Sequence, residues 1–449
     1  MKKLDPNKNV DDVVLGGARK GRLGRITDRA LNTLAVIEQG VPADRALSRT
    51  IKNARDLGSS ERHQLSDVIY TVVRNRRKIQ YKLSKGLKAC GKKIELYNEP
   101  LRLRLEIMVG LVEQGYGLEE LKAWDSYAFK RVPKLFDKIT RSKAPIKDFA
   151  IRCSLPAWMA NRLCEAHGDE TSETWAKALL QRAPLTLRVN QAKVSREEMI
   201  ERLRADYEIS CKPTARSPHG IIIQQSADIE NLPEYLKGEI EIQDEGSQLI
   251  VEALNAKPGD MVLDACAGAG GKTLGIAATM AGQGKIVAVD VEKKKLSELQ
   301  KRSKRAGLSR IKTLDLDLID LPERYKGWAD RVLVDAPCSG TGRLRRQPDT
   351  KWRITEPEML RFPARQYSLL SKGVDAAKPG GVIIYATCSI MHEENEAIVQ
   401  RLLIENPKVQ ALALSETSNC FSSESWTYIE PGPDEEGPDA FFIAAFRKI

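Results

Sequence analysis

The stretch DACAGAGGKT at residues 264–273 follows the short apolar segment MVLDA at residues 261–265. It misses two familiar nucleotide-binding patterns by one residue each. A phosphate-binding P-loop needs a glycine six positions before its lysine, where this chain has Cys266. A dinucleotide fingerprint that begins at Gly268 needs a glycine where this chain has Thr273. The stretch is therefore a glycine-rich turn whose ligand must be identified from the sequence around it.

Short apolar segments alternate with helix-like segments on both sides of this turn. The predicted strands cover residues 261–265, 285–290, 311–315, 330–337 and 380–389. This alternation is typical of a doubly wound parallel sheet and predicts a Rossmann-like α/β domain over residues 240–449. The first four strands end near an aspartate: Asp264, Asp290, Asp315 and Asp335. Helix capping explains one or two such acids, but ligands bind at the carboxyl ends of strands in these sheets.

Two further domains are predicted before the α/β domain. Residues 1–150 are helical, and the apolar stripe of one amphipathic helix is Leu65, Val68, Ile69, Val72 and Val73. An earlier helix is expected from about residue 28 to 39. Residues 151–239 form a small α+β module with strands at 185–190 and 220–225 and helices near 158 and at 197–204.

The composition is that of a globular protein, and its excess of basic residues fits either a polyanionic partner or simply a basic soluble protein. The chain has 449 residues and a net charge of +11. Basic residues occur in two runs of the helical domain, which predict a phosphate-binding face or a solvated surface: Arg19, Lys20, Arg22 and Arg25, then Arg74, Arg76, Arg77 and Lys78.

Eight scattered cysteines and four histidines predict neither a disulfide framework nor a metal site. The start of the chain lacks a signal peptide and no segment is long enough to span a membrane, which predicts a cytoplasmic protein.

The glycine-rich turn is predicted to bind a nucleoside. Gly268, Gly270 and Gly271 allow a ligand to approach the backbone closely. Asp290 can accept the ribose hydroxyls, and Asp315 can accept a hydrogen bond from an adenine amino group. S-adenosylmethionine fits this set and NAD is the alternative. Lys272 can pair with the ligand's carboxylate or with Asp264, or it can be a solvated helix residue.

Two cysteines follow the fourth and fifth predicted strands. Cys338 lies in DAPCSGTG and Cys388 lies in YATCS, so both thiols are expected at one cleft. A single cysteine is most often a small buried hydrophobe. A thiolate that adds to C6 of cytosine, however, makes C5 nucleophilic toward an electrophilic methyl group, and a carboxyl near N3, here Asp335, stabilises the adduct.

The motifs DACAGAGGKT, VAVDVEKKKL, DAPCSGTGRLRRQPDTKW and ATCSIMHEENE together resemble the RNA cytosine-5 methyltransferases of the NOL/NOP/Sun superfamily, specifically the bacterial rRNA type called RsmB or Sun. The resemblance covers roughly the last two-thirds of the chain. It implies that Cys388 is the nucleophile and that Cys338 assists release of the methylated base. It also implies S-adenosyl-L-methionine as cofactor, bound by Cys266, Ala267, Gly268, Ala269, Gly270, Gly271, Lys272, Asp290, Asp315 and Asp335. Gly268-Ala269 departs from the family's usual Ala-Pro, which is expected to loosen the loop slightly.

The resemblance further implies a helical, NusB-like N-terminal domain that binds RNA, although its second half looks shortened. The basic segment after Cys338 is predicted to hold the RNA backbone, with a solvated loop as the alternative: Arg343, Arg345, Arg346, Lys351 and Arg353. The expected partner is 16S rRNA, and no obligate protein partner is evident. Methylation of tRNA and a non-catalytic role in RNA binding or ribosome assembly are the alternative functions.

Overall fold

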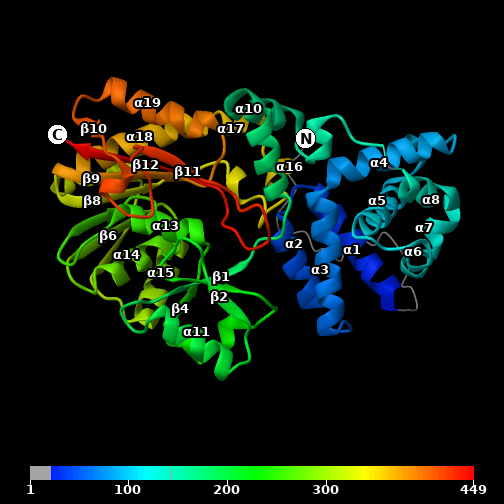
Figure 1. Cartoon of the computed structure of the whole chain (residues 1–449), viewed down its shortest axis with the longest axis horizontal. Helices are drawn as coiled ribbons and strands as arrows, with labels where there is room; N and C mark the ends of the chain where they lie inside the picture. Colours follow the sequence, from blue (N-terminus) through cyan, green and yellow to red (C-terminus); the bar gives the residue numbers. More distant parts are fainter. Residues whose placement is uncertain (1–21, 143) are drawn as a thin grey trace. The chain divides into compact units, whose positions relative to one another are not determined.

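The computed structural model describes residues 22–142 and 144–449, which form two compact units (Figure 1). The helical unit comprises Met1–Leu180 and Arg346–Thr355, and the α/β unit comprises Gln181–Arg345 and Glu356–Ile449. This division groups the chain differently from the three predicted domains. Residues 151–180 join the helices, and the remainder of the predicted middle module joins the large sheet in one unit.

Three helices form the centre of the helical unit: α1 (Arg22–Glu38), α3 (Ser59–Arg74) and α5 (Glu99–Glu113). Each packs against the other two. The apolar stripe predicted from Leu65 to Val73 is fully buried on α3, so this part of the prediction is confirmed. The other helices are α2 (Ala43–Asn53), α4 (Arg76–Ala89), α6 (Leu118–Trp124), α7 (Ser126–Arg131), α8 (Pro133–Arg141), α9 (Phe149–Arg152) and α10 (Ala157–Leu179).

The basic runs of the helical unit are partly neutralised by acids of the same unit. Arg76 pairs with Glu38 at 2.6 Å, and Lys78 pairs with Glu113 at 2.6 Å. Arg25 lies 3.5 Å from Glu61. Arg19 and Lys20 lie outside the described residues. The phosphate-binding face expected from these two runs therefore carries less net charge than the sequence indicates.

The segment Arg346–Thr355 packs on the C-terminal end of α3. Lys351 Nζ donates a hydrogen bond to the Arg74 carbonyl oxygen at 2.9 Å, and Trp352 Nε1 donates to the Val73 carbonyl oxygen at 2.7 Å. Both carbonyls belong to the last turn of α3, where carbonyl oxygens lack helical partners and favour a positive charge. Lys351 is 1% exposed, so the structure corrects the prediction that it contacts RNA.

A small antiparallel sheet begins the α/β unit. Its strand order is β2-β3-β1-β4, with β1 (Leu185–Val189), β2 (Cys211–Pro213), β3 (Gly220–Ile223) and β4 (Ile240–Ile242). Apolar side chains of β1 and β3 pack with those of α11 (Arg196–Ala205) in one core. The two predicted strands and the predicted helix are confirmed, whereas the short strands β2 and β4 were not predicted.

The large sheet has the order β10-β12-β9-β8-β5-β6-β7, and β11 pairs with β12. All five predicted strands are present: β5 (Met261–Asp264), β6 (Lys285–Asp290), β7 (Ile311–Asp315), β8 (Ala329–Asp335) and β9 (Ala377–Thr387). These five run parallel, and β5, β8 and β9 are neighbours as expected. Three further strands were missed: β10 (Val409–Ala411), β11 (Trp426–Ile429) and β12 (Phe441–Lys448), of which β12 runs antiparallel to β9.

Helices cover both faces of this sheet. Alternate strand residues such as Val262 pack against α13 (Glu245–Leu254) and α14 (Gly271–Thr279). Their neighbours, such as Leu263, pack against α18 (Phe362–Ala376) and α19 (Glu396–Glu405). The prediction of a doubly wound Rossmann-like sheet is confirmed. In the described part of the chain, no helix is both long and apolar enough to cross a membrane.

Candidate active site

The glycine-rich turn connects β5 to α14 and leaves one side of its backbone open. Gly268 has φ of +55°, and a Cβ added there would meet nothing within 4 Å. Gly270 has φ of +87°, and a Cβ there would lie 2.5 Å from Leu299 of α15 (Lys293–Ala306). The two glycines therefore have different roles. Gly270 allows α15 to pack closely against the turn, and Gly268 leaves room for a ligand.

The remaining residues of the predicted cofactor loop are held by the protein. The Ala267 amide donates to the Val289 carbonyl at 2.9 Å, and the Ala269 carbonyl accepts from Arg302 at 2.7 Å. Burial raises the pKa of the Cys266 thiol, which keeps it protonated. These contacts fix the loop against β6 and α15.

Asp290 and Asp315 end adjacent strands and are direct register partners. The two Asp290 carboxylate oxygens accept the Gly268 and Glu292 amides, each at 2.8 Å. These bonds fix the orientation of the carboxylate beside the glycine-rich turn. Asp315 is exposed next to it. The two acids therefore lie together at the carboxyl end of the sheet, as the sequence predicted.

Asp264 is buried beneath the loop. Its Oδ2 accepts a hydrogen bond from Thr273 Oγ1 at 2.7 Å, and burial raises its pKa to about 7. Its Oδ1 has no hydrogen-bond partner among the described residues. A buried polar atom without a partner is costly, so this oxygen is suited to a ligand that donates a hydrogen bond from the open side of the loop.

Lys272 connects the loop to β8. Its Nζ lies 2.6 Å from Asp335 Oδ2, and it also lies 5.6 Å from the centre of the Phe441 ring. Asp335 was not among the partners considered for Lys272 from the sequence, because the two residues are 63 positions apart. The ion pair fixes the Asp335 carboxylate at the end of β8, three residues before Cys338.

The two predicted thiols meet at the carboxyl ends of the neighbouring strands β8 and β9. Cys338 Sγ lies 3.2 Å from Cys388 Sγ, and both cysteines are free. The hydrogen bond from Cys338 lowers the pKa of Cys388, and the positive charges of Arg343 and Lys272 act in the same direction against burial. Cys388 is therefore the more acidic thiol of the pair. The same hydrogen bond, together with burial, raises the pKa of Cys338, which stays a thiol.

A buried carboxylate joins the two loops that carry these cysteines. Glu394, in η7 (His392–Glu394), accepts the Ser339 amide at 2.9 Å and the Ser339 hydroxyl at 2.5 Å. It also accepts the hydroxyl of Ser389 and the Gln366 side-chain amide, the latter at 2.9 Å. Ser339 and Ser389 each directly follow one of the two cysteines. Glu394 therefore holds in place the two loops that carry Cys338 and Cys388.

Sequence reasoning missed this role of Glu394. The residue lies in the quoted motif ATCSIMHEENE, but three glutamates follow Cys388 there at positions 393, 394 and 396. Only Glu394 is fully buried. The signal that could have singled it out is the serine that follows each cysteine, since two such hydroxyls at one cleft need an acceptor.

The predicted RNA-binding residues are divided between the two units: Arg343 and Arg345 belong to the α/β unit, and Arg346, Lys351 and Arg353 belong to the helical unit. Arg343 is half-buried in the α/β unit, where its charge lowers the pKa of Cys388. Arg345 is 1% exposed and donates to the carbonyl oxygens of Arg182, Asp434 and Gly437. The structure therefore corrects the prediction for Arg345, whose guanidinium is used to hold loops together. Arg346 is half-buried, and Arg353 pairs with Asp349 at 2.7 Å.

Two family models match this chain. The model described as 16S rRNA methyltransferase RsmB/F matches residues 251–447, and the model of the ferredoxin-like domain of RsmF/B-like methyltransferases matches residues 155–230. The residues matched by the second model include strands β1, β2 and β3 of the small antiparallel sheet.

Individual proteins agree with the family models. The chain is 32% identical to ribosomal RNA small subunit methyltransferase B of Pseudomonas putida over 68% of each chain. It is 27% identical to the probable ribosomal RNA small subunit methyltransferase B of Bacillus subtilis, over 94% of this chain and 98% of that protein. A solved methyltransferase homologue from Pyrococcus horikoshii is 30% identical, with a TM-score of 0.57, and the match covers 67% of this chain and 98% of that one. The chain therefore belongs to the RsmB/F family of 16S rRNA methyltransferases.

Proposed function

We propose that this enzyme transfers a methyl group from S-adenosylmethionine to C5 of a cytosine in small-subunit ribosomal RNA. The observation that carries the proposal is the Cys338–Cys388 pair, 3.2 Å apart, at the same end of the sheet as the Lys272–Asp335 ion pair. Cytosine C5 needs nucleophilic activation at C6, and a thiolate supplies it. The established family of the chain makes RNA the substrate.

The residues of the glycine-rich loop fit S-adenosylmethionine. The open side of Gly268 leaves room for the nucleoside, Asp290 and Asp315 offer acceptors to the ribose and the adenine, and the unpaired Asp264 oxygen can accept a hydrogen bond from an ammonium group. The loop does not offer a lysine to a phosphate, because Lys272 is paired with Asp335. This argues for a ligand without phosphates. When bound, the cofactor supplies an electrophilic methyl group.

Cys388 forms the bond to the base. Its lowered pKa gives a thiolate that adds to cytosine C6, and the charge displaced into the ring is stabilised at N3. Asp335 is the group we assign to N3, where it acts by hydrogen bonding or by protonation. Lys272, which donates to Asp335, keeps the carboxyl in place and provides a nearby proton.

Cys338 acts after the methyl group has been transferred. Its pKa is raised mainly because it donates a hydrogen bond to Cys388, whose negative charge also opposes ionisation. The negative charge of Cys388 disappears once its sulfur is bound to C6 as a neutral thioether, which makes Cys338 more acidic than before. Cys338 can then lose its proton to solvent and remove the C5 proton, so that the C6–sulfur bond breaks and Cys388 leaves as a thiolate. In this way one hydrogen bond sets the order in which the two thiols act.

The test is bisulfite sequencing of ribosomal and transfer RNA from cells with and without the gene. The proposal is supported if a cytosine in small-subunit rRNA is unmethylated in cells that lack the gene and becomes methylated when the purified enzyme is added to that RNA. Loss confined to tRNA would assign the alternative substrate. No change in either RNA would favour a non-catalytic role. Because the substrate is ribosomal RNA, we expect the enzyme to act in the cytoplasm.

A further inference from the structure

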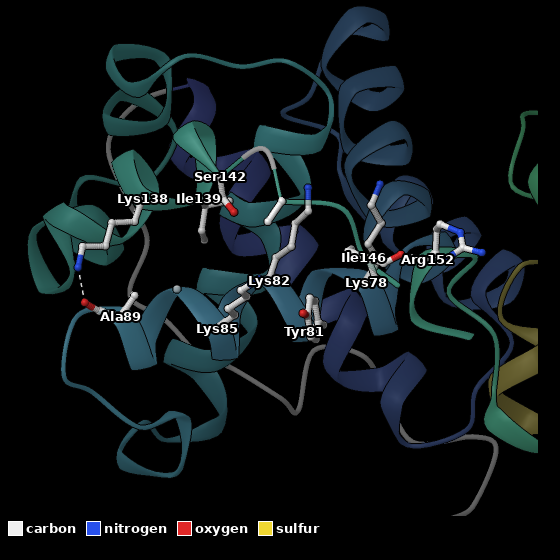
Figure 2. A pocket seen from close by; sticks show the side chains of 12 residues that line it. Lys78, Tyr81, Lys82, Lys85, Ala89, Lys138, Ile139, Ser142, Ile146 and Arg152 are labelled. Carbon is white, nitrogen blue, oxygen red and sulfur yellow. Dashed lines mark hydrogen bonds between the residues drawn. The ribbon is translucent and has the colours of Figure 1, made fainter. Parts of the chain in front are cut away.

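The helical unit contains a groove of about 340 Å³ that is lined by residues of α4 and α8 and by Ala144, Ile146 and Arg152 (Figure 2). One face of α4 forms its first wall, since Lys78, Tyr81, Lys82 and Lys85 recur at helical spacing. Lys138 and Arg152 contribute from the other side. In Figure 2 the side chains of Lys78 and Lys82 project from α4 in the same direction. The groove belongs entirely to one unit and is separate from the active-site thiols.

The lining of this groove is positively charged. Among the described residues that line it, five have basic side chains and none has an acidic one. Behind it, Glu113 pairs with both Lys78 and Lys82, and Glu173 pairs with Arg152 at 2.7 Å. Two acids therefore offset five cations. Lys85 is exposed and has no ion-pair partner among the described residues, and Lys138 donates only to a backbone carbonyl, that of Ala89.

The inner surface of the groove is apolar and includes an aromatic ring. Tyr81 is half-buried, with Lys85 Nζ 5.7 Å from the centre of its ring. Ile139, Ala89 and Ile146 complete this surface. An aromatic ring beside cations is the combination that binds an unstacked base by its face and the adjoining phosphates by charge. An acidic peptide would match the cations but would not need the ring.

We propose that this groove binds an unpaired nucleotide of the RNA substrate, with its base on Tyr81 and its flanking phosphates at Lys85 and Lys138. The proposal rests on the proposed function in that it takes RNA as the substrate. It places a single-strand contact on the helical unit at Tyr81, Lys85 and Lys138, beside Lys78, the last residue of the second basic run. Such a contact increases affinity for RNA but takes no part in the chemistry of methyl transfer.

The experiment measures binding of a short fluorescein-labelled oligouridylate to the full-length protein by fluorescence anisotropy over a range of salt concentrations. Lys85→Gln should flatten the slope of log affinity against log salt by about 0.7, because one phosphate contact is lost. Tyr81→Leu should weaken binding about tenfold and leave the slope unchanged, because it removes stacking but no charge. Tyr81→Phe keeps the ring and should bind like the wild type, which separates stacking from any effect on folding.

The matched control is Lys88→Gln, which removes the same charge from an exposed position of α4 that does not line the groove. Equal effects of Lys85→Gln and Lys88→Gln, or wild-type affinity for Tyr81→Leu, would overturn the proposal. Binding of poly-L-glutamate that depends on Lys85, with no binding of oligouridylate, would overturn it in favour of an acidic protein partner. Binding is measured without cofactor and in Cys388→Ala as well, so a failure of the proposed methylation leaves the outcome for the groove unaffected.

Discussion

Cys338 Sγ lies 3.2 Å from Cys388 Sγ although 50 positions separate the two residues in the sequence. They are brought together because β8 and β9 are parallel neighbours with Asp335 opposite Ala386. The arrangement is asymmetric, because the hydrogen bond lowers the pKa of Cys388 and raises that of Cys338. One thiol is therefore prepared to attack the base, and the other is prepared to act after it.

The division of labour between the thiols can be read from covalent adducts. Cys338→Ala should accumulate a protein–RNA adduct that survives denaturation, since elimination is blocked after methyl transfer. Cys388→Ala and the double variant should give no adduct and no transfer of tritiated methyl groups. An adduct in Cys388→Ala instead would mean that the roles are exchanged. No adduct in any variant, with reduced stability of Cys338→Ala, would mean that Cys338 is only a packing residue.

Glu394→Ala should lower kcat about 100-fold with a smaller effect on KM. The carboxylate binds the loops that carry both thiols, and small displacements of reacting groups reduce rates to about this extent. Glu394→Gln should retain intermediate activity, because serine hydroxyls can reverse their hydrogen bonds. Glu405→Ala, which removes an exposed acid from α19, is the control.

The rate at which the two thiols form a disulfide tests whether Glu394 positions them. Diamide should join Cys338 and Cys388 in a disulfide, and Glu394→Ala should slow that reaction, whereas Glu405→Ala should not. An unchanged rate of disulfide formation together with reduced kcat would show that Glu394 does not position the thiols.

Asp290→Ala should weaken binding of S-adenosylmethionine by about 10- to 100-fold, because charged hydrogen bonds to the ribose are lost. The variant also removes the acceptor of the Gly268 amide, so Asp290→Asn should give a smaller loss. Isothermal titration calorimetry measures both dissociation constants. Asp320→Ala, an exposed acid in the same unit, should bind the cofactor normally. A wild-type dissociation constant for Asp290→Ala would remove this residue from the cofactor site.

Lys351 should make stability depend on pH. Burial lowers its pKa to about 7, whereas an unfolded lysine titrates near 10.4. Between these two values the unfolded chain binds more protons than the folded chain, so this contribution to stability rises as the pH rises from about 7 to about 10. Lys351→Met lacks the titrating group and should show a flatter dependence. Urea unfolding of both proteins across this pH range measures the difference, and parallel curves would contradict the prediction.

The sequence predicted the elements whose signal is local. Five strands of the large sheet, the stripe from Leu65 to Val73 and the small module were recognised because alternation and helical periodicity reflect which face of an element is buried. The short strands β2, β4 and β10 and the two strands β11 and β12 were missed. Strands β2, β4 and β10 have three residues each and β11 has four, too few to show an alternating pattern. In β12 the first six residues are all buried, so apolar and polar residues do not alternate along it.

The sequence by itself determined the chemistry available at the site, because glycines, strand-end acids and two cysteines in a fixed order limit what the cleft can do. The tertiary structure decided which charges are available. It paired Lys272 with Asp335, buried Glu394 between two serines, and used Arg345 and Lys351 to satisfy backbone carbonyls. The sequence does not distinguish an arginine or lysine that binds RNA from one that holds a loop by hydrogen bonds within the protein. The difference depends on burial and on partners far away in the sequence, which exist only when the chain is folded.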